Sequence, residues 1–162
     1  MITDPEILTG YLTDASNVHG RADALFRPTS TEEVAQVLRD AQRSATPVTV
    51  TAGRTSTTAA AVPDGGWLLA MEGLATIHAI GHDTATAQGG VMLGALQDAI
   101  EATDRFYPPD PTSRYECTLG ASIATNASAS SVRISEKRAS RGPRILTSFT
   151  IASSRVLDDE YV

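Results

Sequence analysis

The chain of 162 residues has little of what marks several common classes of protein. Its single cysteine, Cys117, excludes an internal disulfide and is typical of a reducing compartment, so we expect a cytoplasmic protein. Aromatic residues make up only 5% of the chain and the net charge is -6, which together argue against a nucleic-acid partner. No apolar run has the length that a membrane span needs, and the acidic start MITDPE is unlike a secretory signal.

Groupings of residues that carry hydrolytic or metal chemistry are also missing. The sequence has three histidines, His19, His78 and His82. None of them has ligand spacing with another histidine or with the cysteine, so we predict no metal site. No Ser/His/Asp set and no pair of carboxylates stands out, which argues against a hydrolase. We therefore assign no catalytic residue within the chain.

What is present fits one domain of the α+β class, spanning residues 1–162 and built of two lobes. Hydrophobic residues at 41% and charged residues at 20% are typical of a globular protein long enough to bury a core. Residues 25–64 predict a small α/β lobe, because Ser30 and Glu33 fit a capping box before a helix and a half-buried strand follows at 48–50. The expected apolar stripe of this helix is Val34, Val37, Leu38 and Ala41.

Residues 65–162 predict a larger, strand-rich lobe. Its most distinct helix carries Leu93, Leu96 and Ile100 on one face, with Gly94 as an unfavourable residue within it. The expected strands lie at 67–71, 75–80, 84–88, 145–152 and 155–157, and the second and third of them form a hairpin.

The stretch YPPDPTSRYECTLGASIATNAS, from Tyr107 to Ser128, is the most specific pattern in the chain. Its prolines hold the backbone rigid, and Asp110 between them is better explained by turn formation than as a general base. Small and hydroxylated residues follow. They let a ligand lie close to the main chain and form hydrogen bonds with its amides and hydroxyls.

A second pattern, TAGRTSTTAAAVP at residues 51–63, directly follows the strand expected at 48–50. The two patterns together resemble the FAD-linked oxidases, the group that contains the glycolate oxidase flavin subunit and D-lactate dehydrogenases. In that family a glycine-rich loop binds the FAD pyrophosphate, and segments of the form PPDP, T-[LI]-G-G and I-A-T-N-A-S-G pack against the flavin. The resemblance implies the α+β fold of the PCMH and vanillyl-alcohol oxidase flavoproteins.

The resemblance also implies FAD as the cofactor and assigns residues to it. For Gly53 and Thr55, a purely structural turn is about as good an interpretation as ligand contact. Cys117, which precedes the T-L-G segment, is better explained as a small buried hydrophobe. The pyrophosphate would lie on Ala52, Gly53, Arg54, Thr55 and Ser56. The flavin and its ribityl chain would lie on Pro109, Asp110, Ser113, Thr118, Leu119, Gly120, Ser122, Thr125, Asn126 and Ser128.

The chain departs from the family pattern at several glycines. Positions that need a positive φ would each lose about 1–2 kcal/mol with any other residue. The guanidinium of Arg54 would either contact the phosphate or fill its place. Ala121 likewise replaces the second glycine of T-L-G-G. Four loop positions where the family usually has glycine hold other residues: Arg54, Ser56, Ala59 and Ala60.

We further expect the family's closing flavin segment and its substrate domain to be absent. The first hypothesis is therefore the FAD-binding part of an oxidoreductase that acts on 2-hydroxy acids and needs a missing domain or a second polypeptide for turnover. The alternative is a non-catalytic remnant that keeps the fold but no longer binds FAD. A third hypothesis is a truncated, poorly folded product with an open sheet edge.

Overall fold

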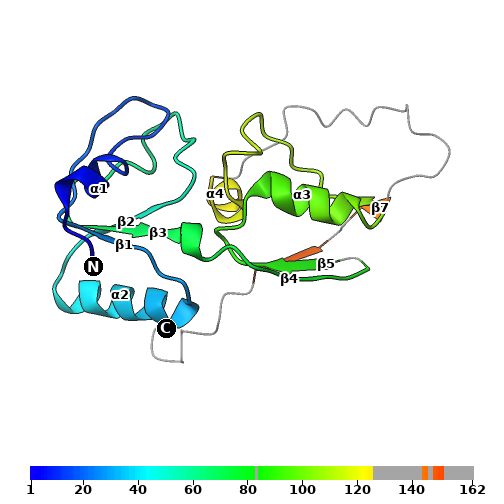
Figure 1. The fold of residues 1–162 in the computed structure, drawn as a ribbon, viewed down its shortest axis with the longest axis horizontal. Helices are drawn as coiled ribbons and strands as arrows, with labels where there is room; N and C mark the ends of the chain where they lie inside the picture. The colour runs from blue at the N-terminus through cyan, green and yellow to red at the C-terminus, as the bar shows by residue number, and fades with distance from the viewer. Residues whose placement is uncertain (83, 126–143, 146–147, 152–162) are drawn as a thin grey trace. The chain divides into compact units, whose positions relative to one another are not determined.

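The computed structural model describes residues 1–82, 84–125, 144–145 and 148–151. Within these residues the chain divides into two compact units, Met1–Leu74 and a second unit that begins at Ala75 (Figure 1). None of the helices in the described ranges combines the length and apolar content of a membrane-spanning segment. The same ranges hold no cluster of three or more His, Cys, Asp or Glu side chains suited to a metal ion.

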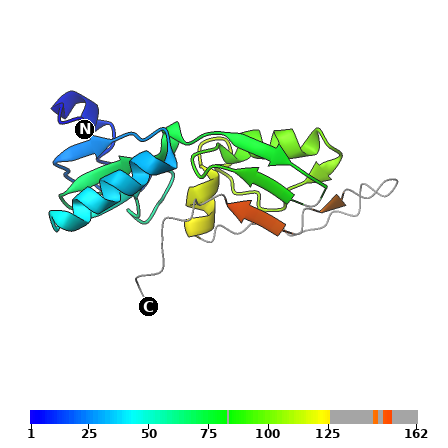
Figure 2. The same cartoon turned by 90° about the horizontal axis from the view of Figure 1, so that it is seen from below.

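The first unit is built around a parallel sheet of three strands. The order in the sheet is β1-β3-β2, so β3, the last of these three strands along the chain, lies between the other two. The helix α2 lies on one face of this sheet (Figures 1 and 2). The elements are α1 (Pro5–Thr9), β1 (Ala24–Phe26), α2 (Thr31–Arg43), β2 (Val48–Thr51), β3 (Trp67–Ala70) and the 3₁₀ turn η1 (Met71–Gly73).

Alternation along the strands gives this sheet two apolar faces. Leu25, Leu68 and Ala70 pack with Leu8 of α1 into one buried cluster, so the N-terminal segment covers that face. Successive side chains in a strand point to opposite faces, which places the buried Leu69 on the other face. The parallel register places Thr49 and Thr51 beside Leu68 and Ala70, on the face of the N-terminal segment.

The capping box expected before α2 is confirmed, with one change of partner. The hydroxyl of Ser30 accepts a hydrogen bond from the Glu33 amide at 3.2 Å, as the S-x-x-E pattern predicts. The Glu33 carboxylate, however, accepts from the amide and hydroxyl of Thr29, at 2.7 and 3.2 Å. The predicted stripe is partly buried: Val37 and Ala41 are buried, whereas Leu38 is 45% exposed.

The second unit contains a three-stranded sheet, covered on one face by a helix (Figures 1 and 2), and a separate two-stranded sheet. The predicted hairpin is confirmed by the antiparallel pair of β4 and β5, and the predicted helix by α3. Ala85 and Ala87 pack under the α3 side chains Leu93, Leu96 and Ile100, which form the core of this unit. Its elements are β4 (Ile77–Ile80), β5 (Thr84–Ala87), α3 (Leu93–Glu101), β6 (Arg105–Phe106), α4 (Leu119–Ala124), β7 (Arg144–Ile145) and β8 (Ser148–Ile151).

Gly94, the residue that seemed out of place in α3, has a packing role. A Cβ at this position would lie 2.4 Å from the Tyr115 ring, and the Gly94 amide donates to the Arg114 carbonyl at 2.7 Å. The segment after the proline turn therefore passes directly over the first turn of α3. Contact with this distant segment outweighs the weaker helix propensity of glycine.

One feature differs from the sequence-based expectation. The lobe boundary was expected at 64/65, but β3 pairs with β1 and β2 in the first unit, which extends to Leu74. The run of small residues after Thr118 forms the short helix α4. The described residues do not include Asn126, Ser128 or the strand expected at 155–157.

Candidate cofactor site

The loop after β2 offers a row of unused backbone donors. In the described part of the chain, none of the amides of residues 53–57 donates to an acceptor. The hydroxyl of Thr51, the last residue of β2, is buried and has no partner there either. Donors gathered just past the carboxyl end of a parallel strand are suited to an anionic group such as phosphate. The residues present thus fit the pyrophosphate of a dinucleotide.

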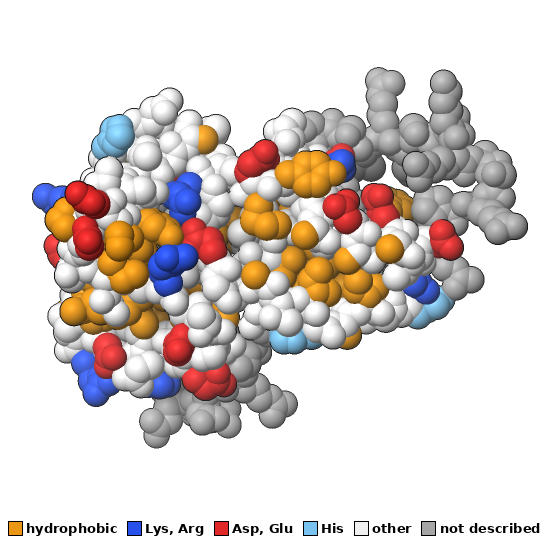
Figure 3. Space-filling view, in the orientation of Figure 1, with side chains coloured by type: hydrophobic (Ala, Val, Ile, Leu, Met, Phe, Trp, Pro, Cys, Tyr) orange, Lys and Arg blue, Asp and Glu red, His pale blue; other side chains and the backbone are white. Residues whose placement is uncertain are grey.

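Basic side chains are not gathered at this loop to supply positive charge for a phosphate. On the face drawn in Figure 3, Lys and Arg side chains are scattered rather than gathered into a basic patch. The arginine within the loop, Arg54, has its charge engaged elsewhere. Its Nη1 donates to the Glu72 Oε1 at 2.8 Å and to the Ala52 carbonyl at 3.0 Å, and its Cζ lies 4.6 Å from the centre of the Tyr11 ring. Backbone donors are therefore the main candidates for phosphate contact.

The backbone angles show which lost glycines matter. Arg54 and Ala59 have φ values of 53° and 59°, in the left-handed region that favours glycine. Ser56 and Ala60 are not among the described residues with a positive φ. Two of the four replaced positions thus carry the expected strain, which is about 1–2 kcal/mol for each residue.

A buried carboxylate holds the far end of the loop. Asp14 accepts hydrogen bonds from the amide and hydroxyl of Ser16 and, at 3.4 Å, from the Ala61 amide. The neighbouring Ala15 amide donates to the Arg54 carbonyl at 3.0 Å. Burial alone would raise the pKa of Asp14, but hydrogen bonds from Ser16, Ala61 and Ser56 outweigh burial and lower this pKa below 3.8.

This role of Asp14 was not predicted from the sequence. The available signal was an aspartate followed two residues later by serine, a spacing that favours a side-chain turn. The distant partner, Ala61, leaves no mark in the local sequence.

In the second unit the proline turn is held by a buried glutamine. The Gln97 side-chain amide donates to the Pro109 carbonyl at 2.7 Å, although Gln97 lies in the apolar face of α3. Asp110 forms an ion pair with Arg114 at 3.2 Å. This role of Gln97 was also not predicted from the sequence. The available signal was a polar residue between Leu96 and Ile100 in an otherwise apolar stripe.

The residues after the proline turn lead into α4. The Ser113 carbonyl accepts from the amides of Glu116 and Cys117, at 2.9 and 2.8 Å. Cys117 is buried, and burial raises the pKa of its thiol, which matches the expected small hydrophobe. Thr118 is the N-cap of α4, since its hydroxyl accepts from the Ala121 amide at 3.4 Å.

The hydroxyls within α4 donate to the helix itself. Ser122 donates to the Leu119 carbonyl at 2.8 Å, and Thr125 to the Ala121 carbonyl at 2.9 Å. Both oxygens keep acceptor capacity, but Ser122 is buried and Thr125 is exposed. The buried Leu119 belongs to the apolar core of the unit, so its side chain serves packing.

Gly120 is the glycine of this segment that the fold requires. Its amide donates to the Gly89 carbonyl at 2.8 Å, and a Cβ would lie 2.9 Å from that same oxygen. The T-L-G segment thus approaches the turn before α3 backbone to backbone. The structure gathers Ala52–Ser56 in one loop of the first unit, and the segments from Pro109 to Thr125 around α3 and α4 of the second.

Comparison with known proteins identifies the class to which these features belong. A family model described as "FAD binding domain" matches residues 22–139. The D-lactate dehydrogenase of Anaerostipes hadrus is 34% identical over 134 residues, which cover 78% of this chain and 28% of the relative. The glycolate oxidase subunit GlcD of Bacillus subtilis is 31% identical over 108 residues, which cover 65% of this chain and 23% of the relative.

Solved structures agree on the fold. An alkyldihydroxyacetonephosphate synthase superposes with a TM-score of 0.71 at 20% identity, covering 79% of this chain and 27% of that one. The 6-hydroxy-D-nicotine oxidase of Arthrobacter nicotinovorans gives 0.55 at 23% identity, covering 61% and 22%. The fold is therefore that of the PCMH-type FAD oxidases, as the sequence predicted.

The chain belongs to the FAD-binding domain family of the FAD-linked oxidases, and FAD is the cofactor that this membership supports. It spans about a quarter of the length of the curated relatives it matches. The resemblance read from the proline turn and the small-residue segments is confirmed.

Proposed function

We propose that the chain binds FAD as part of a flavoprotein oxidoreductase that oxidises 2-hydroxy acids. The observation that carries the proposal is the row of available amides at residues 53–57, next to the buried hydroxyl of Thr51. These donors lie inside the region that matches the FAD-binding family. The substrate class rests on relatives named D-lactate dehydrogenase, glycolate oxidase and D-2-hydroxyglutarate dehydrogenase.

In this proposal each unit is assigned its own set of FAD-contacting residues. Residues Ala52–Ser56 hold the pyrophosphate through their amides. Pro109, Asp110, Ser113 and the segment from Thr118 to Ser128 line the flavin and ribityl chain. The close approach of Gly120 to Gly89 and the hold of Gln97 on Pro109 support a rigid wall of main chain here.

FAD, when bound, accepts the hydride that an oxidised substrate gives up. This chain's own residues bind and orient the cofactor, and no base for the substrate was assigned among them. We propose that a further domain or a second polypeptide supplies that base and the substrate contacts. The unpaired Cys117 suits a reducing compartment, so we place the protein in the cytoplasm.

The proposal is tested by titrating the purified protein with FAD and measuring flavin absorbance and fluorescence after desalting. The key comparison is Gly53→Asp against Gly53→Asn, two side chains of equal size that differ in charge. If the pyrophosphate lies on this loop, the Asp variant should bind FAD about tenfold more weakly than the Asn variant, because a carboxylate repels phosphate. Equal affinities would move the pyrophosphate away from Gly53.

The alternative of a non-catalytic remnant has one observation in its favour, the strained φ angles at Arg54 and Ala59. A remnant would give no retained flavin while circular dichroism still reports helix and sheet. That outcome would support the assigned fold and reject the proposed FAD function.

A further inference from the structure

We propose that Arg54 is a positioning residue: its side chain fixes the conformation of the phosphate loop and does not contact the phosphate. This inference rests on the proposed FAD function of the loop. The contacts of Arg54 form what we call the Arg54 clasp, made of its guanidinium, the Glu72 carboxylate, the Tyr11 ring and the Ala52 carbonyl.

The first step of the argument is the conformation of Arg54. Its φ of 53° is one that a residue with a side chain adopts at a penalty and glycine adopts freely. The same residue has three partners for its side chain and, through its carbonyl, a fourth in the Ala15 amide at 3.0 Å. Contacts to both main chain and side chain over-determine this backbone conformation, which is how strained residues persist in folded proteins.

The second step is where the partners come from. Tyr11 and Ala15 lie in the N-terminal segment, before the family match begins at residue 22. Glu72 lies in η1, directly after β3. The clasp thus joins the loop after β2 to two other parts of the first unit. Contacts from these two segments stabilise a positive φ that glycine would adopt without any partner.

The third step is the charge. Arg54 and Glu72 are each about one third exposed, and their 2.8 Å ion pair occupies the cation. The other Glu72 oxygen, Oε2, is buried without a hydrogen-bond partner in the described part of the chain. If Arg54 turned toward a phosphate, Glu72 would lose its only cation among the described ion pairs. The geometry therefore favours an arginine that stays with Glu72.

The test is a double-mutant cycle at Arg54 and Glu72, in which the Kd for FAD is measured for each variant. Arg54→Ala keeps the strained angle and removes the clasp, so it should raise the Kd about tenfold. Arg54→Gly removes the clasp and the strain together, so it should bind FAD at least threefold more tightly than Arg54→Ala. Glu72→Gln should raise the Kd about threefold with Arg54 present and have no effect in the Arg54→Gly background.

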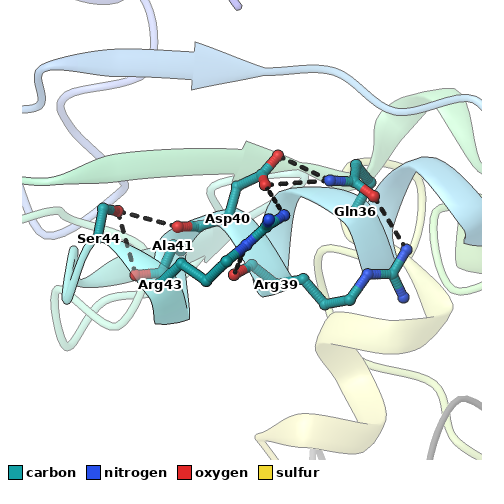
Figure 4. Close-up of polar contacts among 6 residues, drawn as sticks. All are labelled: Gln36, Arg39, Asp40, Ala41, Arg43 and Ser44. Carbon is teal, nitrogen blue, oxygen red and sulfur yellow. Dashed lines mark hydrogen bonds and ion pairs between the residues drawn. The ribbon is translucent and has the colours of Figure 1, made fainter.

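A direct phosphate contact predicts the opposite effect of Glu72. Glu72→Gln would then tighten FAD binding by releasing the guanidinium for the phosphate. That result overturns the clasp, as would an equal effect of Glu72→Gln in the wild-type and Arg54→Gly backgrounds. The matched control is Asp40→Asn, which breaks the exposed Arg43–Asp40 ion pair on α2, within a chain of side-chain contacts that also includes Gln36 (Figure 4). This control should leave the Kd unchanged.

If the wild-type protein binds no FAD, the proposed function fails and the clasp is decided by thermal unfolding instead. Glu72→Gln should then lower the Tm of the wild type but not that of Arg54→Gly. Equal losses in both backgrounds would overturn the clasp independently of the cofactor.

Discussion

Two alanine-for-glycine exchanges in the loop after β2 show that the same replacement has different consequences at different positions. Ala59 has a φ of 59°, whereas Ala60 is outside the set of described residues with a positive φ. Both stand where the family usually has glycine, and the sequence gives no means of telling them apart. Only the backbone angle separates a strained site from an ordinary one.

Ala59→Gly should raise the free energy of unfolding by about 0.5–1 kcal/mol, because relief of left-handed strain exceeds the added freedom of the unfolded chain. Ala60→Gly, one residue away, should instead lower it by up to about 1 kcal/mol, since only the entropic term remains. Urea denaturation of both variants measures the difference. A loss of stability in Ala59→Gly would contradict the assigned backbone conformation.

Asp14 should make the stability of the protein depend on pH. Its pKa in the folded chain lies below 3.8, so its stabilising contribution is complete above about pH 4 and is lost as the pH falls through the folded value. Asp14→Asn lacks this contribution at every pH. The difference in unfolding free energy between wild type and variant should therefore be largest near neutral pH and shrink below 3.8. A constant difference down to pH 3 would show that the carboxylate charge is not involved.

At the scale of elements, local patterns in the sequence were sufficient where local interactions decide the structure. The capping pair Ser30 and Glu33 correctly located the start of α2, and the strand-like runs at 75–80 and 84–88 correctly predicted the hairpin. No local pattern indicated α1 and α4, which have 5 and 6 residues. Isolated helices that short are not stable, so they depend on tertiary contacts that the local sequence does not record.

The contact between α4 and the turn before α3 leads to a prediction at this scale. Gly120→Ala should lower the free energy of unfolding by about 1–3 kcal/mol, because its Cβ would meet the Gly89 carbonyl oxygen at 2.9 Å. Gly10→Ala is the matched control. A Cβ there would meet only the Ile7 carbonyl, at an ordinary 3.6 Å, and no loss is expected. Equal effects of the two substitutions would argue against the close backbone approach.

For the whole molecule, the class and cofactor followed from the sequence, but the division into units did not. The strand pattern at Trp67 was correct, yet its partners, β1 and β2, placed it in the first unit. Strand pairing joins residues about 20 to 40 positions apart, and periodicity carries no information about the choice of partner. The candidate site shows the same limit. The sequence predicted its two segments, residues 52–56 and 109–128, but not the contacts that Asp14 and Gln97 make to them.

Hydrogen exchange should report FAD binding across the whole chain in one measurement. The amides of residues 53–57, which have no acceptor in the described part of the chain, should exchange rapidly without FAD and at least about tenfold more slowly with it. Interior amides of α2 are already bonded within the helix and should not change. Bound FAD with unaltered exchange at 53–57 would place its pyrophosphate outside this loop.

The strand order β1-β3-β2 also determines how the first unit must assemble during synthesis. Neither β1 nor β2 pairs with the other, so a nascent chain that ends before Trp67 has both outer strands and no strand to join them. When residues 67–70 emerge from the ribosome, they insert between the two strands and complete the sheet. The loop at residues 52–63 connects β2 to this final strand. This loop therefore acquires its shape in the same event that closes the sheet, rather than being added to a finished scaffold.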